Sequence, residues 1–277
     1  MKYSLLALCF AFLVSCSSSD DEKDYRLEND DEIAAYILAN NLVAQKTASG
    51  LYYVIEEQGT GAQLTSSSSV TVTYKGSYTS GTAFDDSKGE LVSFSLQNVI
   101  TGFTEGLSYF NEGGKGILLI PAHLGYGSKD YKEIPGGSVL IFEIIVYSPE
   151  MIAEKNEADI VAYLDANDIN ATRSDTGLYY TIEEEGTGVQ PTATSNVTVA
   201  YKGYYLDGEV FDESGSNGVS FGLNQVIKGW AEGITYYKEG GNGKLFIPAA
   251  LAYGNYNYST IPGGSVLIFD VKLISVN

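Results

Sequence analysis

Histidine and cysteine, which often act as bases, nucleophiles or metal ligands, are rare in this chain. Its 277 residues include one histidine, His123, and two cysteines, Cys9 and Cys16. The acidic clusters at 30–32 and 183–185 lack calcium-loop spacing, so we interpret them as solvated faces. The GxG triplets in "EEQGTG" and "EEEGTG" are not followed by a dinucleotide-binding pattern. We therefore predict no metal and no cofactor, and we expect His123 to be a surface residue rather than a catalytic base.

Aromatic residues dominate instead, and they recur in a long repeat. The chain has 22 tyrosines and 11 phenylalanines, and the nine residues "IPGGSVLIF" occur twice, from Ile134 and from Ile261. The same offset of 127 (261 − 134) aligns further motifs: "GLYY" at Gly50 and Gly177, "YKG" at Tyr74 and Tyr201, and "IPA" at Ile120 and Ile247. A period of this length matches an independent domain rather than a solenoid repeat. We predict two copies of one domain, at 31–149 and 150–277.

Each copy has the pattern of a helix followed by short strands. Ile33, Tyr36 and Ile37 share one face of a helix, as do their equivalents Ile160, Tyr163 and Leu164. Alternation in "VTVTYKG" and "SVLIFEIIV" predicts strands with one apolar face each. In the second copy Asp270 and Lys272 give the last strand a partly wet side. A short apolar helix, "VITGFTEGLSYF" or "VIKGWAEGITYY", lies between strands. This order predicts an α+β fold in which an antiparallel sheet curls around that helix, and a short amphipathic helix precedes each domain.

The ordered motifs resemble a known family. They are Tyr-x-Gly, Gly-x-x-Phe-Asp, Phe, Val-Ile-x-Gly-[Phe/Trp]-x-Glu-Gly, Ile-Pro-Ala with Tyr-Gly close behind, and Ile-Pro with a final Phe. This series is similar to the FKBP family of peptidyl-prolyl cis/trans isomerases, the macrolide-binding immunophilins. The resemblance runs from about residue 51 to 146 and from about 178 to 273, which is most of the chain.

The chemistry that this resemblance implies agrees with the composition. The barrier to prolyl isomerisation, about 18–20 kcal/mol, is the lost resonance of the amide. No acid, base or metal is needed to lower it. An apolar, water-poor pocket lined with rings binds the twisted amide better than the planar one, and this preference accelerates the exchange.

The resemblance implies two pockets. In the first domain the implied residues are Tyr74, Phe84, Asp85, Phe94, Val99, Ile100, Phe103, Tyr126, Ile134 and Phe142. In the second they are Tyr201, Phe211, Asp212, Phe221, Val226, Ile227, Trp230, Tyr253, Ile261 and Phe269.

The resemblance also implies a role for several of these residues. Trp230 or Phe103 is the pocket floor, and the Tyr after Ile-Pro-Ala donates a hydrogen bond to a ligand carbonyl. The Ile of Val-Ile offers its backbone N–H, and the Asp accepts a hydrogen bond from the Tyr of Tyr-x-Gly. Two departures concern the rim. The basic residue that many members place near the Asp is missing, and Tyr131 and Tyr258 stand where an aromatic residue or histidine flanks the pocket.

The first residues indicate export and lipid attachment. Residues 1–15 have one lysine and then an apolar run too short to span a bilayer, which is typical of a signal peptide. The segment at 13–16, "LVSC", resembles the lipobox of bacterial lipoproteins, in which the signal is cut before the cysteine, here Cys16, and its sulfur is lipidated. The following residues, 16–30, are predicted to be an acidic tether. They resemble the export signal that places some lipoproteins of Bacteroides-like bacteria on the outer face of the outer membrane.

The charge limits the partners. Without Lys2 the chain has 15 basic residues (16 − 1) and 35 acidic ones, a balance of −20 that repels nucleic acid. Membrane attachment is therefore expected through the lipid on Cys16 alone. Proline-containing polypeptides are the expected partners, and macrolide inhibitors follow from the resemblance.

We predict a lipid-anchored tandem prolyl isomerase that assists the folding of envelope or secreted proteins. One alternative is a non-catalytic module that holds X-Pro segments in the same pockets, as a chaperone or interaction domain. The sequence does not separate these two, because binding and catalysis use one pocket. A purely structural role is disfavoured, since both ring sets are intact.

Overall fold

The computed structural model describes residues 23–277. The chain divides into two compact units, and the boundary in the sequence lies between Ser148 and Pro149. The predicted signal peptide at 1–15, the lipidation site Cys16 and the start of the predicted tether lie outside the described residues.

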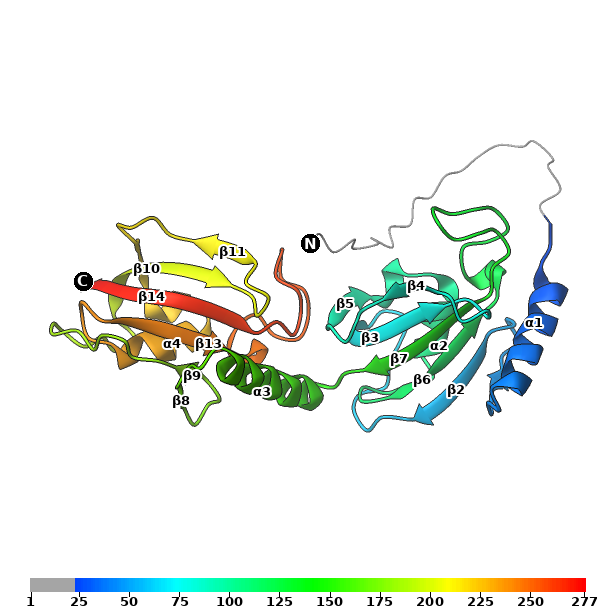
Figure 1. Ribbon diagram of the computed structural model, residues 1–277, viewed down its shortest axis with the longest axis horizontal. Helices are drawn as coiled ribbons and strands as arrows, with labels where there is room; N and C mark the ends of the chain where they lie inside the picture. The colour runs from blue at the N-terminus through cyan, green and yellow to red at the C-terminus, as the bar shows by residue number, and fades with distance from the viewer. Residues whose placement is uncertain (1–22) are drawn as a thin grey trace. The chain divides into compact units, whose positions relative to one another are not determined.

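Each unit contains an N-terminal helix, a sheet and a short helix between strands (Figure 1). The first unit comprises α1 (Arg26–Ala39), β1 (Gln45–Lys46), β2 (Tyr52–Glu57), β3 (Ser69–Ser77), β4 (Ala83–Asp86), β5 (Val92–Ser95), η1 (Leu96–Asn98), α2 (Thr101–Leu107), β6 (Lys115–Ile120), η2 (Ala122–Leu124) and β7 (Leu140–Val146). The second comprises α3 (Pro149–Ala166), β8 (Thr172–Arg173), β9 (Tyr179–Tyr180), β10 (Asn196–Tyr204), β11 (Val210–Glu213), β12 (Val219–Gly222), η3 (Leu223–Gln225), α4 (Lys228–Gly233), η4 (Ile234–Tyr236), β13 (Asn242–Ile247), η5 (Ala249–Leu251) and β14 (Leu267–Val276).

The two sheets have the same topology. In the first the order is β1-β2-β6-β7-β3-β4, and β5 also pairs with β3. In the second the order, read from the other end, is β8-β9-β13-β14-β10-β11, and β12 also pairs with β10. All the paired strands within the described part of the chain are antiparallel. The predicted α+β class with two similar domains is confirmed.

The last strand of each sheet separates two apolar layers. On β7, Leu140, Phe142, Ile144 and Val146 face the main core with α2, as the alternation predicts. The intervening Ile141 points to the opposite face. The second unit repeats this division on β14. The core around α4 there includes every second residue of the strand, namely Leu267, Phe269, Val271 and Leu273.

The N-terminal helix of each unit covers the second face of its sheet. Ile33 of α1 is fully buried against Leu119 and Ile141, with Tyr36 and Ile37 packed beside it. Figure 1 shows α1 running beside the first sheet. In the second unit Ile160 of α3 is buried in the same way. The helices are therefore a third layer, which the sequence indicated only as helices with one apolar face.

The end of the predicted tether needs correction. Helix α1 begins at Arg26, inside the tether predicted for 16–30, and Asn29 is buried. The Asp30 carboxylate accepts hydrogen bonds from Lys46 and from Tyr52. The second acidic cluster, at 183–185, is exposed as predicted, and Glu185 pairs with Lys238 at 2.7 Å on the surface. Acidic residues are favourable in the first turn of a helix, so an acidic run is compatible with a helix start.

Residues 23–277 contain neither a candidate membrane-spanning helix nor a candidate metal-binding group. No helix in this part of the chain is both long and apolar enough to cross a bilayer. No group of three or more His, Cys, Asp or Glu side chains gathers there in a way that could hold a metal ion.

Candidate functional site

The first domain brings its predicted pocket residues into one aromatic cluster. Nine of the ten predicted residues belong to the main core or pack against it, and Asp85 is tied to the cluster through Tyr74. The ring of Phe103, on α2, meets Phe142 edge-on at a centroid distance of 5.1 Å. Phe94 and Phe84 complete the set, at 5.6 Å from Phe103 and 5.5 Å from Phe142 respectively. This cluster surrounds the position that the resemblance gives to the pocket floor.

The second domain builds the same cluster around an indole. Trp230, on α4, meets Tyr201 and Phe269 edge-on at 5.1 Å, and Phe221 at 5.4 Å. Of the ten predicted residues, eight belong to this core or its immediate shell. Asp212 and Tyr253 lie at the rim instead, and Tyr253 is 40% exposed. An edge-to-face arrangement satisfies the ring quadrupoles and fixes the shape of the floor.

A tyrosine–aspartate hydrogen bond joins two of the predicted residues of each pocket. The Tyr74 hydroxyl donates to Asp85 at 2.7 Å, and the Tyr201 hydroxyl donates to Asp212 at 2.7 Å. Burial and the neighbouring carboxylate raise the pKa of Tyr201 to about 12. Burial also raises the pKa of Tyr126 to about 12. These phenols therefore keep their protons at neutral pH, and each remains a hydrogen-bond donor.

Two donors at each pocket have no partner within residues 23–277. In the first domain they are the backbone N–H of Ile100 and the hydroxyl of Tyr126. In the second they are the backbone N–H of Ile227 and the hydroxyl of Tyr253. Ile100 and Ile227 have extended backbone directly before α2 and α4, so their N–H groups lie outside the helical hydrogen bonds. Each predicted pocket thus has an apolar ring cluster and two donors available to peptide carbonyls, the composition expected of a small ligand site.

Sequence reasoning missed the glycine of Tyr-Lys-Gly as a site residue. A Cβ atom at Gly203 would lie 2.7 Å from both Phe211 and Phe269, and Gly76 stands in the same relation to Phe84. Only glycine lets these two rings close over the strand. The repeat of "YKG" was a visible signal, but spacing alone did not show that the missing side chain makes room for the pocket.

The rims of the two pockets differ. Tyr126 stacks on Tyr131, and Tyr253 stacks on Tyr258, each at a centroid distance of 4.8 Å. The two flanking tyrosines, 131 and 258, therefore contact the predicted donor tyrosines, and their place at a pocket edge stays a prediction. In the first domain the Tyr78 hydroxyl also donates to the carbonyl of Glu133 across the rim, at 3.4 Å. Within the described chain, the equivalent Tyr205 hydroxyl makes no such bond, so this link is present at the first rim alone.

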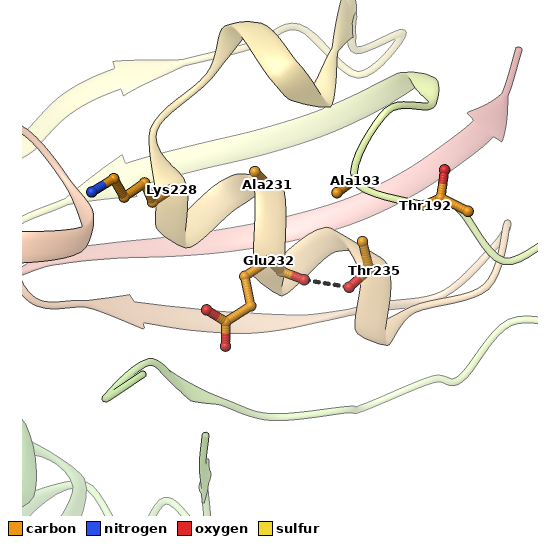
Figure 2. A pocket seen from close by; sticks show the side chains of 6 residues that line it. All are labelled: Thr192, Ala193, Lys228, Ala231, Glu232 and Thr235. Atoms are coloured by element: carbon orange, nitrogen blue, oxygen red, sulfur yellow. Dashed lines mark hydrogen bonds between the residues drawn. The ribbon is translucent and has the colours of Figure 1, made fainter. Parts of the chain in front are cut away.

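Two other features lie outside the pockets. His123 is exposed, and its imidazole bonds the carbonyl oxygen of Ser49 at 2.8 Å, so it does not face the rings. Figure 2 shows a shallow hollow beside α4, lined by Thr192, Ala193, Lys228, Ala231, Glu232 and Thr235. Lys228, Ala231 and Glu232 come from α4, and Thr235 comes from the following η4. The Glu232 carboxylate is already bonded to Thr176 and Tyr236. The hollow therefore offers no converging set of free groups.

Comparison with known proteins identifies the family. Residues 61–147 and 188–274 match the FKBP-type peptidyl-prolyl cis-trans isomerase family, once in each domain. The chain belongs to this family.

Known relatives match slightly less than half of the chain. The chain is 41% identical over 125 residues to the FKBP-type peptidyl-prolyl cis-trans isomerase FkpA of Aeromonas hydrophila, covering 44% of this chain and 46% of that protein. It is 43% identical over 131 residues to the Escherichia coli K12 protein of the same name, covering 46% and 48%. The crystal structure of E. coli FkpA matches 47% of this chain and 62% of that chain, at 41% identity and a TM-score of 0.42. The chain spans about half the length of the curated relatives it matches.

Proposed function

We propose that this protein catalyses cis/trans isomerisation of X-Pro bonds in envelope or secreted proteins, and that both domains are active. The observation that carries the proposal is the pairing, in each domain, of an edge-to-face ring floor with two unpartnered donors. The floor receives the proline ring, and the donors hold the carbonyls on either side. The bond itself lies in an apolar setting that favours the twisted amide.

Refolding separates catalysis from mere binding. Uncatalysed X-Pro exchange takes tens to hundreds of seconds, so it limits the refolding of many proteins. Substoichiometric amounts of this protein are expected to shorten such a slow phase. A module that only holds X-Pro segments would leave the phase unchanged or lengthen it, because it would stabilise one isomer.

The two pockets are expected to report binding differently. Trp230 is the only tryptophan, and it forms the floor of the second pocket. An X-Pro peptide or a macrolide entering that pocket is expected to change the emission of the indole, whereas binding over Phe103 is nearly silent. The larger ring should make the second pocket bind more tightly by about 1 kcal/mol, because it offers more apolar contact area and stacking.

Titration calorimetry on the full chain checks this order of affinities. The affinity of each pocket is measured in a variant whose other pocket no longer binds, because both residues of its Phe-Asp pair are replaced by alanine. Trp230→Phe should reduce the difference in affinity between the two pockets. Equal affinities, or tighter binding at the first pocket, would show that the residues of the rim affect the affinity more than the ring at the floor does. Saturation of the second pocket with unchanged emission would mean that the ligand does not reach Trp230.

The proposal includes a lipid anchor at Cys16, in the outer membrane and exposed at the cell surface. It is supported by "LVSC" after an apolar run and by the acidic residues that follow. Cys16→Ala is expected to abolish incorporation of a labelled fatty acid and cleavage at that site. Cys9→Ala, in the apolar run, is the matched control and should leave both unchanged. Protease added to intact cells should degrade the wild type, and full protection would place the protein on the inner side.

A further inference from the structure

An asparagine on each N-terminal helix makes two buried hydrogen bonds to loops at the pocket. The Asn156 side-chain amide donates to the carbonyl of Gly264 at 2.8 Å, and its oxygen accepts from the N–H of Ala249 at 2.8 Å. In the first domain Asn29 bonds Gly137 and Ala122 in the same way, at 2.9 Å each. These asparagines are 2% and 1% exposed.

The two bonded loops carry pocket residues. Ala249 opens the turn that leads from β13 to Tyr253, while Gly264 ends the turn that follows Ile261. The loops also meet directly, because the Gly264 N–H donates to the carbonyl of Gly254, next to Tyr253, at 3.0 Å. The asparagine therefore joins the start of one rim loop to the end of the other.

This arrangement is an unusual use of a helix. Asparagine is a poor helix former, and a buried amide is costly unless its polar atoms are bonded. Both helices nevertheless place it at the same position, 127 residues apart (156 − 29), and bond it at both ends. The helices lie before the segments that match the family, which begin at 61 and 188. The contact thus joins a helix outside the matched segment to two loops inside it, since Ala249 and Gly264 lie within 188–274.

We infer that Asn29 and Asn156 are positioning residues for the two pockets. Each holds the loop of the donor tyrosine, Tyr126 or Tyr253, at a fixed distance from the loop of the rim isoleucine, Ile134 or Ile261. The helix thereby sets the pocket geometry from the far face of the sheet. This inference rests on the proposed function, since it concerns the same pockets.

Aspartate substitution tests the inference with a pH readout. In Asn29→Asp/Asn156→Asp the carboxylate still accepts from Ala122 and Ala249, but it repels the glycine carbonyl that the amide bonded. A protonated carboxyl restores the donor. We expect kcat/KM for an X-Pro peptide to fall about tenfold at pH 8 and to recover as the pH falls, while the wild type changes little. Burial and the facing carbonyl should place the recovery above the ordinary carboxyl pKa of about 4.

The second domain gives the cleaner pH profile. In the first, His123 adjoins Ala122, and the Asp130 carboxylate accepts from the N–H of Gly136. In the second, Ala250 and Asn257 occupy these positions, so neither group titrates there. The charged neighbour on α3, Glu157, is paired with Arg173 at 2.9 Å, and Lys155 is paired with Asp159 at 2.9 Å. Asn156→Asp alone is therefore measured beside the double variant.

A matched control removes the packing of the helix without touching the bonds. Ile33→Ala/Ile160→Ala truncates two fully buried side chains on the same helices. If the asparagines only anchor the helix, the asparagine and isoleucine double variants should behave alike. For the same loss of unfolding free energy, they should then show the same loss of activity. We expect the isoleucine variants, measured well below their melting temperature, to keep wild-type kcat/KM. Should the aspartate variant fail to fold at pH 8, Asn29→Ala/Asn156→Ala should show the same loss in kcat/KM.

Two outcomes would overturn the inference while leaving the proposed function standing. One is a folded asparagine variant with wild-type kcat/KM. The other is a loss that does not depend on pH and matches that of the isoleucine control. An inactive wild type would instead contradict the proposed function, and peptide affinity reported by Trp230 emission would then be the readout. Asn156→Asp should weaken that affinity about tenfold at pH 8, and an unchanged affinity would reject the inference.

Discussion

Alanine at both Phe-Asp pairs, Phe84-Asp85 and Phe211-Asp212, is expected to remove most of the isomerase activity. Each phenylalanine ring lies 5.5 Å from the final Phe of its pocket, and each aspartate accepts the bond of the wall tyrosine. Burial of one such ring is worth about 1.5–3 kcal/mol, and about 1.4 kcal/mol of transition-state stabilisation is a factor of ten in rate. The loss in kcat/KM should therefore be at least about tenfold.

Variants with one pair replaced separate the domains. If both pockets are active, each variant with one pair replaced keeps part of the isomerase activity. The residual activities of the two variants then add up to about the activity of the wild type. Circular dichroism and thermal unfolding establish that the variants are folded. A folded chain with both pairs replaced and wild-type activity would show that the chemistry lies elsewhere.

Alanine at Gly116 or Gly243 is expected to cause a large loss of stability. A Cβ atom at Gly116 would overlap the carbonyl oxygen of Val54 on the paired strand, and one at Gly243 would overlap the carbonyl oxygen of Thr181. The obstacle is backbone in both cases, so a rotamer change does not relieve it. Overpacking of this kind costs about 1–3 kcal/mol, and more when strands must separate.

Chemical denaturation of the single variants measures this loss. Gly215→Ala is the matched control, because nothing lies within 4 Å of a Cβ atom there. Its free energy of unfolding should stay within about 0.5 kcal/mol of the wild type. Equal stability of Gly243→Ala and Gly215→Ala would contradict the close approach of the strands.

The repeat and the alternation of apolar residues predicted much of the fold and the pockets. Strands β7 and β14 keep a two-residue period, so the core face of each could be read directly from the sequence. The ring sets follow ordered motifs, and the structure gathers them as clusters. The face covered by the N-terminal helix could not be read, because periodicity marks an apolar stripe and not its partner.

Asn29 and Asn156 show why the rest of the site escaped prediction. Both sit in runs of acidic residues, which are typical of a solvated helix face, and neither belongs to a motif of the resemblance. Their match at the 127-residue offset was visible in the sequence. What they bond depends on tertiary packing, which joins residues 93 and 108 positions apart.

The exchange rate of a short Leu-Pro or Phe-Pro peptide tests the central claim most directly. The rate is measured by exchange NMR, with the wild-type protein present in catalytic amounts. The account predicts that the cis-to-trans rate rises in proportion to protein concentration, and that the cis:trans ratio at equilibrium stays unchanged. A folded protein that binds the peptide, as reported by Trp230 emission, while the exchange stays at the uncatalysed rate would contradict it.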